Sequence, residues 1–120
     1  MKLSETSKKR IVGLKPDLLK VIAAVEDVCP FPMSVGADGG LRSLARQKEL
    51  LAEGKSKTLK SKHLTGHAVD LYPLTNDAKR IAPDRYNELA KIVKAQARHL
   101  GVKIYWGFDL WGWDKPHYQL

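Results

Sequence analysis

The most regular hydrophobic pattern of this sequence lies between residues 84 and 100. Its apolar and small residues recur at helical spacing, at Tyr86, Leu89, Ala90, Val93, Ala97 and Leu100. Residues at this spacing share one face of an α-helix. Asp84 is placed to cap the start of the helix and Gly101 to end it. The pattern predicts one long amphipathic helix, and the rest of the fold must supply an apolar surface for its buried face.

Two further helices are predicted nearer the N-terminus. Pro16 suits a first helical turn, and the helix that follows should stop before Pro30. Its apolar residues at helical spacing are Leu18, Leu19, Ile22, Val25 and Val28. Another helix is expected over residues 43–53, with Leu44, Leu50 and Leu51 facing inward and Gly54 as its end. Ser4 is a candidate N-cap for the first segment of the chain.

Four short segments have the composition of strands, at residues 31–35, 67–72, 102–106 and 116–120. Residues 55–62 are basic and polar without periodicity, so we expect a loop there. Helices and strands do not alternate regularly, as they would in a doubly wound sheet. The expected fold is therefore of the α+β class, with a small antiparallel sheet.

Length and charge limit what the chain can be. Its 120 residues form one domain, residues 1–120, and the net charge of +8 favours anionic partners such as nucleic acid, wall polymers or lipid headgroups. Neither a membrane span of roughly 18 apolar residues nor a secretory signal is visible. We therefore expect the chain to be made in a cytoplasm, without membrane insertion. We also expect it to be a monomer. The single cysteine, Cys29, excludes an internal disulfide and a cysteine-rich zinc site.

Residues suited to metal chemistry gather in two segments. His63 and Asp70 lie in the first, and Asp114 and His117 in the second. Two imidazoles and one carboxylate suit a catalytic zinc with a fourth position left for water. Asp114, three residues before His117, is close enough to act as general base. By spacing alone, such a set can also arise by accident.

Both segments resemble the motifs of the zinc D-alanyl-D-alanine carboxypeptidase and L-alanyl-D-glutamate endopeptidase family. The first motif, S-x-H-x-x-G-x-A-x-D, is filled by Ser61, His63, Gly66, Ala68 and Asp70. The second, an acidic residue two positions before a histidine, is filled by Asp114 and His117. Residues 40–47 and 55–58 are similar to the segments that lead to the first motif. The similarity is greatest to the phage endolysin branch, and it implies a hedgehog-like peptidase fold with helices and sheet around a zinc cleft.

The resemblance also implies roles for single residues. His63, Asp70 and His117 would hold one Zn²⁺ per chain, and Asp114 would be the catalytic base. Arg42 would stabilise the oxyanion that forms in the transition state. Ser61 would hold a ligand or the substrate backbone, and Asp109 would orient a ligand histidine from behind. Gly66 and Ala68 would be small because the chain turns close to the metal.

The chain departs from the family pattern at three places. Phe108 replaces a frequent glycine, which puts the shape of its loop in question. Gly39 stands where relatives often carry Glu, which would remove a polar contact near Arg42. The base is Asp rather than the Glu of the carboxypeptidase branch, and this favours the endopeptidase branch.

Other reactive residues have ordinary interpretations. We expect His67 to be a polar neighbour and His99 a surface residue, and Arg46 is the residue most easily confused with Arg42. Cys29 is expected to be a buried hydrophobe. Most aromatic residues of the cluster at 105–113 should pack in the core or a loop, with one or two lining a cleft. The basic run at 55–62 is by default a solvated loop, although it can also attract anionic wall polymer.

The sequence thus predicts a phage-type zinc endolysin that cleaves the L-alanyl-D-glutamate bond of peptidoglycan stem peptides. It would stay in the host cytoplasm until a separate membrane-permeabilising protein gives it access to the wall. One alternative is a D-alanyl-D-alanine carboxypeptidase or dipeptidase with the same zinc site. A more remote alternative is a small basic nucleic-acid-binding module, against which the absence of a recognisable nucleic-acid motif argues.

Overall fold

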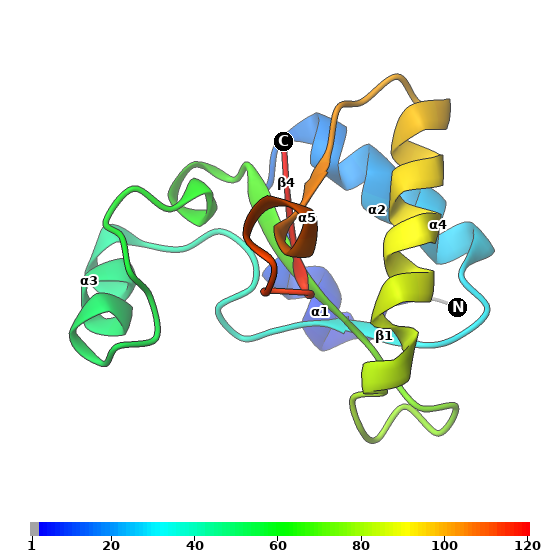
Figure 1. The fold of residues 1–120 in the computed structure, drawn as a ribbon, viewed down its shortest axis with the longest axis horizontal. Helices are drawn as coiled ribbons and strands as arrows, with labels where there is room; N and C mark the ends of the chain where they lie inside the picture. Colours follow the sequence, from blue (N-terminus) through cyan, green and yellow to red (C-terminus); the bar gives the residue numbers. More distant parts are fainter. Residues whose placement is uncertain (1–2) are drawn as a thin grey trace.

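A four-stranded antiparallel sheet flanked by helices organises the chain (Figure 1). The computed structural model describes residues 3–120. The helices are α1 (Glu5–Arg10), α2 (Pro16–Val28), α3 (Leu44–Ala52), α4 (Tyr86–His99) and α5 (Gly107–Trp111), with 3₁₀ turns η1 (Lys62–Thr65) and η2 (Pro83–Arg85). The strands are β1 (Met33–Val35), β2 (Ala68–Pro73), β3 (Tyr105–Trp106) and β4 (His117–Gln119). The predicted α+β class with a small antiparallel sheet is confirmed.

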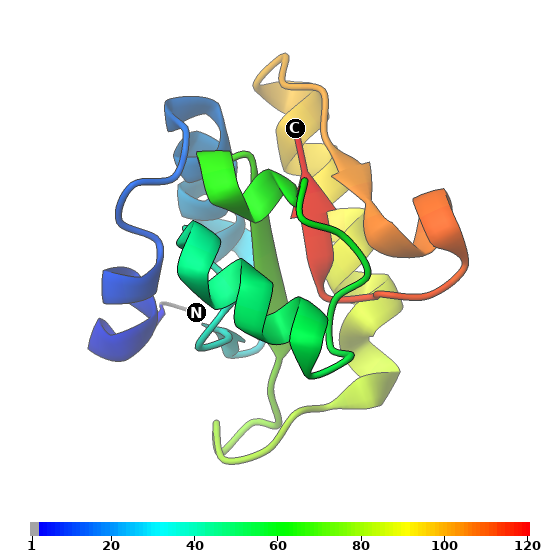
Figure 2. The same cartoon turned by 90° about the vertical axis from the view of Figure 1, so that its left-hand side faces the viewer.

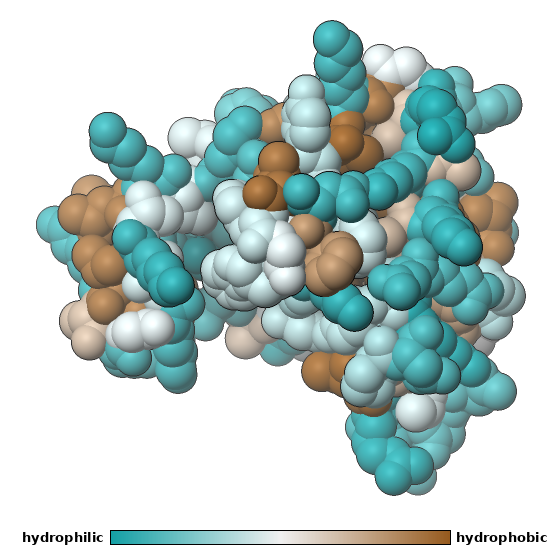
Figure 3. Space-filling model, viewed as in Figure 1, coloured by the Kyte–Doolittle hydropathy of each residue, from teal (hydrophilic) through white to brown (hydrophobic). Residues whose placement is uncertain are grey.

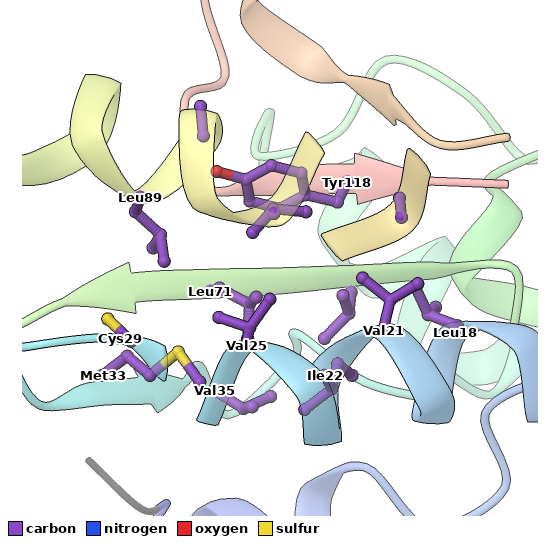
Figure 4. Packing of buried hydrophobic residues seen from close by; sticks show 14 of the residues in the cluster. Leu18, Val21, Ile22, Val25, Cys29, Met33, Val35, Leu71, Leu89 and Tyr118 are labelled. Atoms are coloured by element: carbon purple, nitrogen blue, oxygen red, sulfur yellow. The ribbon is translucent and has the colours of Figure 1, made fainter. Parts of the chain in front are cut away.

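The two faces of the sheet have different neighbours. The strand order is β1-β2-β4-β3, so the last strand of the chain lies in the middle, between β2 and β3. Leu71 of β2 and Tyr118 of β4 point into the core against α2 and α4 (Figure 4), and Val69 of β2 belongs to the same buried cluster. Alternate residues point the other way, so Asp70, His117 and Gln119 lie on the opposite face. That second face carries α3 and η1 in front of it (Figure 2).

Most of the predicted helix boundaries are confirmed. α2 begins at Pro16 and ends at Val28, and the hydroxyls of Ser4 and Ser43 accept capping hydrogen bonds at the starts of α1 and α3. Gly101, at φ +71°, follows α4 as expected. These positions were predictable because caps and prolines act locally.

The inward face predicted for α3 is wrong. Leu44 is 52% exposed and Leu51 37% exposed, whereas Leu50 and the polar Gln47 are buried. α3 lies away from the apolar core and packs against the loop at 55–62, where the Gln47 amide donates to the Thr58 carbonyl over 2.6 Å. Figure 3 shows hydrophobic side chains at the surface of this lobe.

Asp84 is not the cap of the long helix. Pro83 starts the η2 turn first, so Asp84 lies inside that turn, and α4 begins at Tyr86 without a side-chain cap. At the other end, Leu100 is 42% exposed rather than buried. The predicted helix was therefore right in its buried middle and in its end at Gly101, and wrong in its cap and in the burial of Leu100.

Three of the strands, β1, β3 and β4, are shorter than predicted, β2 has its predicted length, and one helix was missed. Residues 102–104 lie outside β3, and residues 107–111 form α5. Five residues are too few for a helical period to be visible in a sequence. Phe108 lies within α5, so its place does not need the positive φ of a glycine. Across residues 3–120, every helix is too short or too polar to span a bilayer.

Candidate metal centre

The three predicted metal ligands meet on the open face of the sheet. His63, Asp70 and His117 each offer a ligand atom, and these atoms lie within 4.8 Å of one another. Nε2 of His63 and Nδ1 of His117 are both 3.3 Å from Oδ1 of Asp70. Both histidines are buried and Asp70 is half-buried. A cation placed among them would be largely shielded from bulk water.

Strand pairing brings Asp70 and His117 together. The two residues are direct partners in the antiparallel pair of β2 and β4. The Cβ atoms of directly opposed residues lie about 4.5–5.5 Å apart on the same face of a sheet. Two ligands that are 47 residues apart in sequence are thereby fixed next to each other by the backbone.

A short turn delivers the third ligand. His63 lies in η1, where the Ser61 hydroxyl accepts a hydrogen bond from the His63 backbone N–H at 3.2 Å. This contact fits the expectation that Ser61 holds a ligand. Gly66 then ends η1 at φ +76°, and β2 starts two residues later.

The small size of Gly66 has a different cause from the one expected. A Cβ at Gly66 would lie 2.7 Å from the Gly13 carbonyl oxygen, and the Gly66 carbonyl accepts from the Lys15 N–H. The N-terminal segment, rather than a nearby metal, therefore requires glycine here. Ala68 is fully buried at the start of β2.

Residues 39–42 form a bracket around the ligands. The Gly39 carbonyl accepts from the Asp70 N–H at 2.8 Å, and the Arg42 N–H donates to the His63 carbonyl at 2.9 Å. Between them, the Gly40 carbonyl lies 3.0 Å from His63 Nδ1. Gly40 must be glycine, because an added Cβ would lie 1.8 Å from the Arg10 carbonyl oxygen.

Gly39 is also tightly placed. A Cβ there would lie 3.0 Å from the Cβ of Asp70. The backbone of this residue thus contacts the candidate ligand Asp70 directly. A larger residue would press on that side chain.

Each candidate histidine has its second ring nitrogen bonded to an acceptor. His63 Nδ1–H donates to the Gly40 carbonyl, and His117 Nε2–H donates to Gln119 Oε1 at 2.9 Å. These bonds leave His63 Nε2 and His117 Nδ1 facing Asp70 Oδ1, so each ring can offer that nitrogen to a cation after losing the proton it shares with the carboxylate. Such outer hydrogen bonds fix the tautomer and orientation of metal-binding histidines.

Sequence reasoning assigned this orienting role to Asp109 and missed Gly40 and Gln119. Within the described chain, the carboxylate of Asp109 pairs with Lys94 of α4 and not with a ligand histidine. Gln119 follows His117 by two residues in a strand, so it shares the same face. That spacing is the signal that could have identified it.

Asp70 is held in its ionised form. Burial opposes ionisation, but the hydrogen bonds with His117 and His63 outweigh burial and lower the pKa of Asp70 to about 2. A carboxylate that stays ionised at neutral pH is the form that binds a divalent cation.

Asp114 stands beside the ligands in a constrained turn. Its φ is +60°, its carbonyl accepts from the His117 N–H, and a Cβ on Gly107 would lie 2.5 Å from that carbonyl oxygen. Trp106 Nε1 donates to the Lys115 carbonyl and holds the same turn. Burial and the negative charge of Asp70 raise the pKa of Asp114. A carboxylate with a raised pKa is a better proton acceptor.

The side chain of Arg42 is fixed by three hydrogen bonds. Its Nε and Nη2 donate to the Asp38 carbonyl, and its Nη1 donates to Gln47 Oε1 at 2.8 Å. A guanidinium has five N–H donors, so donors on both terminal nitrogens remain for another acceptor. Arg46 instead pairs with Asp38, Glu49 and Glu53, as a surface residue does.

The remaining reactive residues lie outside the cluster. His67 Nδ1 contacts the Thr65 hydroxyl at 2.6 Å, and His99 is exposed on α4. Cys29 is buried, its Sγ–H donates to the Phe31 carbonyl, and burial raises the pKa of its thiol. The predicted interpretation of Cys29 as a small buried hydrophobe agrees with this environment.

Comparisons with known proteins identify the family of this chain. The model of the phage L-alanyl-D-glutamate peptidase family matches residues 1–119. The L-alanyl-D-glutamate peptidase of Escherichia phage T5 is 28% identical over 114 residues, which cover 90% of this chain and 80% of that protein. The crystal structure of the Serratia marcescens L-Ala D-Glu endopeptidase ChiX superposes with a TM-score of 0.85 at 37% identity, covering 99% of this chain and 90% of the other. The chain therefore belongs to the phage L-alanyl-D-glutamate peptidase family.

Proposed function

We propose that this chain is a zinc-dependent endopeptidase that hydrolyses the L-alanyl-D-glutamate bond of peptidoglycan stem peptides and acts as a phage endolysin. The observation that carries the proposal is the convergence of His63 Nε2 and His117 Nδ1 on Asp70 Oδ1. Membership of the peptidase family supports the same activity.

The donor set fits zinc. Zinc in catalytic sites takes three protein ligands of the nitrogen and oxygen types, and two imidazoles with one carboxylate meet this description. His63, Asp70 and His117 would hold the ion, with Gly40 and Gln119 orienting the two rings. When bound, zinc lowers the pKa of water and polarises the substrate carbonyl.

Asp114 is the proposed proton carrier. Its raised pKa lets it accept a proton from the attacking water, and the same carboxyl then gives that proton to the leaving amine. The close approach of Gly107 to Asp114 and His117 supports a position of this carboxyl beside the candidate ligands.

Arg42 is the proposed electrostatic partner of the reaction. Its contacts with Asp38 and Gln47 fix the guanidinium before substrate arrives. Positive charge placed in advance stabilises the negative oxygen of a tetrahedral transition state without reorganisation.

The setting of the reaction is also part of the proposal. We expect residues 1–120 to act as one monomeric zinc peptidase domain, on the bacterial wall and not on nucleic acid. The enzyme would collect in the host cytoplasm and reach the wall after a separate protein permeabilises the membrane.

Mass spectrometry of digested peptidoglycan tests the proposal. The expected products are stem peptides that begin with D-glutamate, together with glycan strands that keep one L-alanine on each lactyl group. Release of terminal D-alanine alone would instead establish the carboxypeptidase alternative. His63→Ala should give neither product, whereas His99→Ala, a change at an exposed histidine, should digest like the wild type.

A further inference from the structure

Two tryptophans lie exposed at the edge of the candidate metal centre. Trp111 is 49% exposed and Trp113 58% exposed, whereas Trp106 is 7% exposed. Tryptophan side chains are on average highly buried. The two exposed rings lie 6.3 Å apart between centroids, and the surface over α5 shows pale and hydrophobic side chains with strongly hydrophilic ones around them (Figure 3).

These rings adjoin the chemistry. The centroid of Trp111 is 5.2 Å from that of the candidate ligand His117. Trp113 directly precedes Asp114, the proposed base. We call Trp111 and Trp113 the aromatic wall of the site.

A basic segment faces the aromatic wall. Lys57 Nζ lies 5.9 Å from the centroid of Trp113, and the chain from Lys57 leads through η1 to His63. We call the four lysines of this segment the basic wall; they are Lys55, Lys57, Lys60 and Lys62. Of these lysines, Lys57 brings its charge to the aromatic wall, whereas Lys55 pairs with Glu53 and Lys62 donates to the Leu120 carbonyl.

The substrate is two-sided, and this step rests on the proposed function. On one side of an L-alanyl-D-glutamate bond stands a single alanine, roughly 3.5 Å long, joined through its lactyl group to an uncharged sugar ring. On the other side stands D-glutamate, whose free carboxylate is adjacent to the scissile amide. Charge complementarity assigns the carboxylate to the basic wall and the sugar to the aromatic wall.

We propose that Trp111 and Trp113 form a saccharide subsite, which binds the pyranose that carries the stem peptide. One face of a pyranose ring presents C–H groups, which pack against an indole and remove apolar surface from water. The subsite gives the enzyme a preference for glycan-linked stem peptides over the same peptides without sugar.

Paired substrates test this preference. One is the disaccharide-linked tetrapeptide, and the other is the same tetrapeptide with its amine acylated by lactate, so the two differ by the sugars alone. We expect kcat/KM to be about tenfold higher for the sugar-bearing substrate, as one good ring contact provides. Trp113→Ala and Trp111→Ala should reduce this ratio of kcat/KM values toward one. Leu110→Ala, at an exposed residue of the helix that carries Trp111, should preserve the ratio.

A binding measurement keeps the test independent of catalysis. Titration of the peptide-free disaccharide into the protein should shift the indole N–H signals of Trp111 and Trp113 in NMR spectra. The Trp106 signal is the internal control. Its chemical shift should not change, because its N–H donates a hydrogen bond to the Lys115 carbonyl.

The outcomes separate the two proposals. Indole shifts without cleavage of either substrate would support the subsite and overturn the proposed function. Cleavage of both substrates at equal rates, with unmoved indole signals, would overturn the subsite and leave the function in place. Indole signals that shift with protein concentration, and not with added sugar, would also overturn the saccharide subsite. In that case a second copy of the chain would cover the aromatic wall.

Discussion

At the ligand histidines, single hydrogen bonds decide which ring nitrogen is presented to a cation. The Gly40 carbonyl holds His63 and the Gln119 side chain holds His117. Neither partner belongs to the two motifs by which the site is found in the sequence. A backbone carbonyl leaves no mark in a sequence, and a glutamine near the end of a strand has many ordinary uses.

Gln119→Ala should weaken zinc binding by about 10- to 100-fold, because His117 loses the acceptor that fixes its ring. Gln119→Glu retains an acceptor at the same distance and should bind zinc more tightly than the alanine variant. Competition with a chromophoric chelator measures both affinities. Equal zinc affinity for Gln119→Ala and the wild type would remove the orienting role of Gln119.

The grouping of the three candidate ligands was predictable because metal chemistry demands particular side chains. The two histidines and Asp70 could be named because few residue types bind a divalent ion, and the structure brings them together. Asp109 could not be placed, because its partner Lys94 comes from a helix whose position follows from tertiary packing. Leu44 and Leu51 were misplaced for the same reason.

Among the elements, the segment 39–42 positions the site most directly. It runs between α1 and the ligands, and it touches Arg10 on one side and His63 and Asp70 on the other. The sequence marks it as a turn through its glycines, but not as the support of a metal centre.

Gly40→Ala should destabilise the fold by at least about 3 kcal/mol, because the new Cβ would overlap the Arg10 carbonyl oxygen. Zinc affinity should fall as well, since the Gly40 carbonyl moves away from His63. Gly54→Ala is the matched control: its φ is +75° with open space around it, so strain of about 1–2 kcal/mol is expected. Urea unfolding measures the loss of stability, and zinc titration measures the loss of affinity. Equal losses of stability and zinc affinity in the two variants would contradict the supporting role of residues 39–42.

The lobe around α3 depends in part on Asp38. A hydrogen bond with Arg46 lowers the pKa of the Asp38 carboxyl below its ordinary value of 3.8. Because the folded pKa is lowered, the stabilisation is complete above the unfolded pKa and is lost as pH falls through the folded pKa.

Asp38→Asn should therefore cost less than about 1 kcal/mol at pH 7, as expected for a half-exposed pair. The difference from the wild type should shrink as pH drops below about 3.8. Urea unfolding across pH 2–7 measures this difference. A difference that persists at the lowest pH would show that Asp38 acts through something other than its charge.

For the whole molecule, the sheet explains why a small chain can hold a catalytic centre. One face is the apolar core with α2 and α4, and the other carries the ligands, so function and stability are separated by the strand period of two. The α+β class was predictable from element composition, whereas strand order and the pairing of Asp70 with His117 depend on contacts distant in sequence.

The net charge of +8 should draw the protein to anionic wall polymers. Cosedimentation with purified walls should fall as salt rises from 50 to 500 mM, because screening shortens the Debye length to a few ångström, about 3 Å at 1 M. Binding that does not change with salt would show that contacts other than charge hold the enzyme on the wall.

The central claim is that His63, Asp70 and His117 hold one zinc ion and that Asp114 moves the proton. Zinc content and peptidoglycan cleavage, measured on the same protein preparations, test it most directly. The wild type and His99→Ala should carry one zinc per chain and be active, His63→Ala should lose both properties, and Asp114→Asn should keep zinc while losing at least about 100-fold in rate. Full zinc content in His63→Ala, or full activity in Asp114→Asn, would contradict the account.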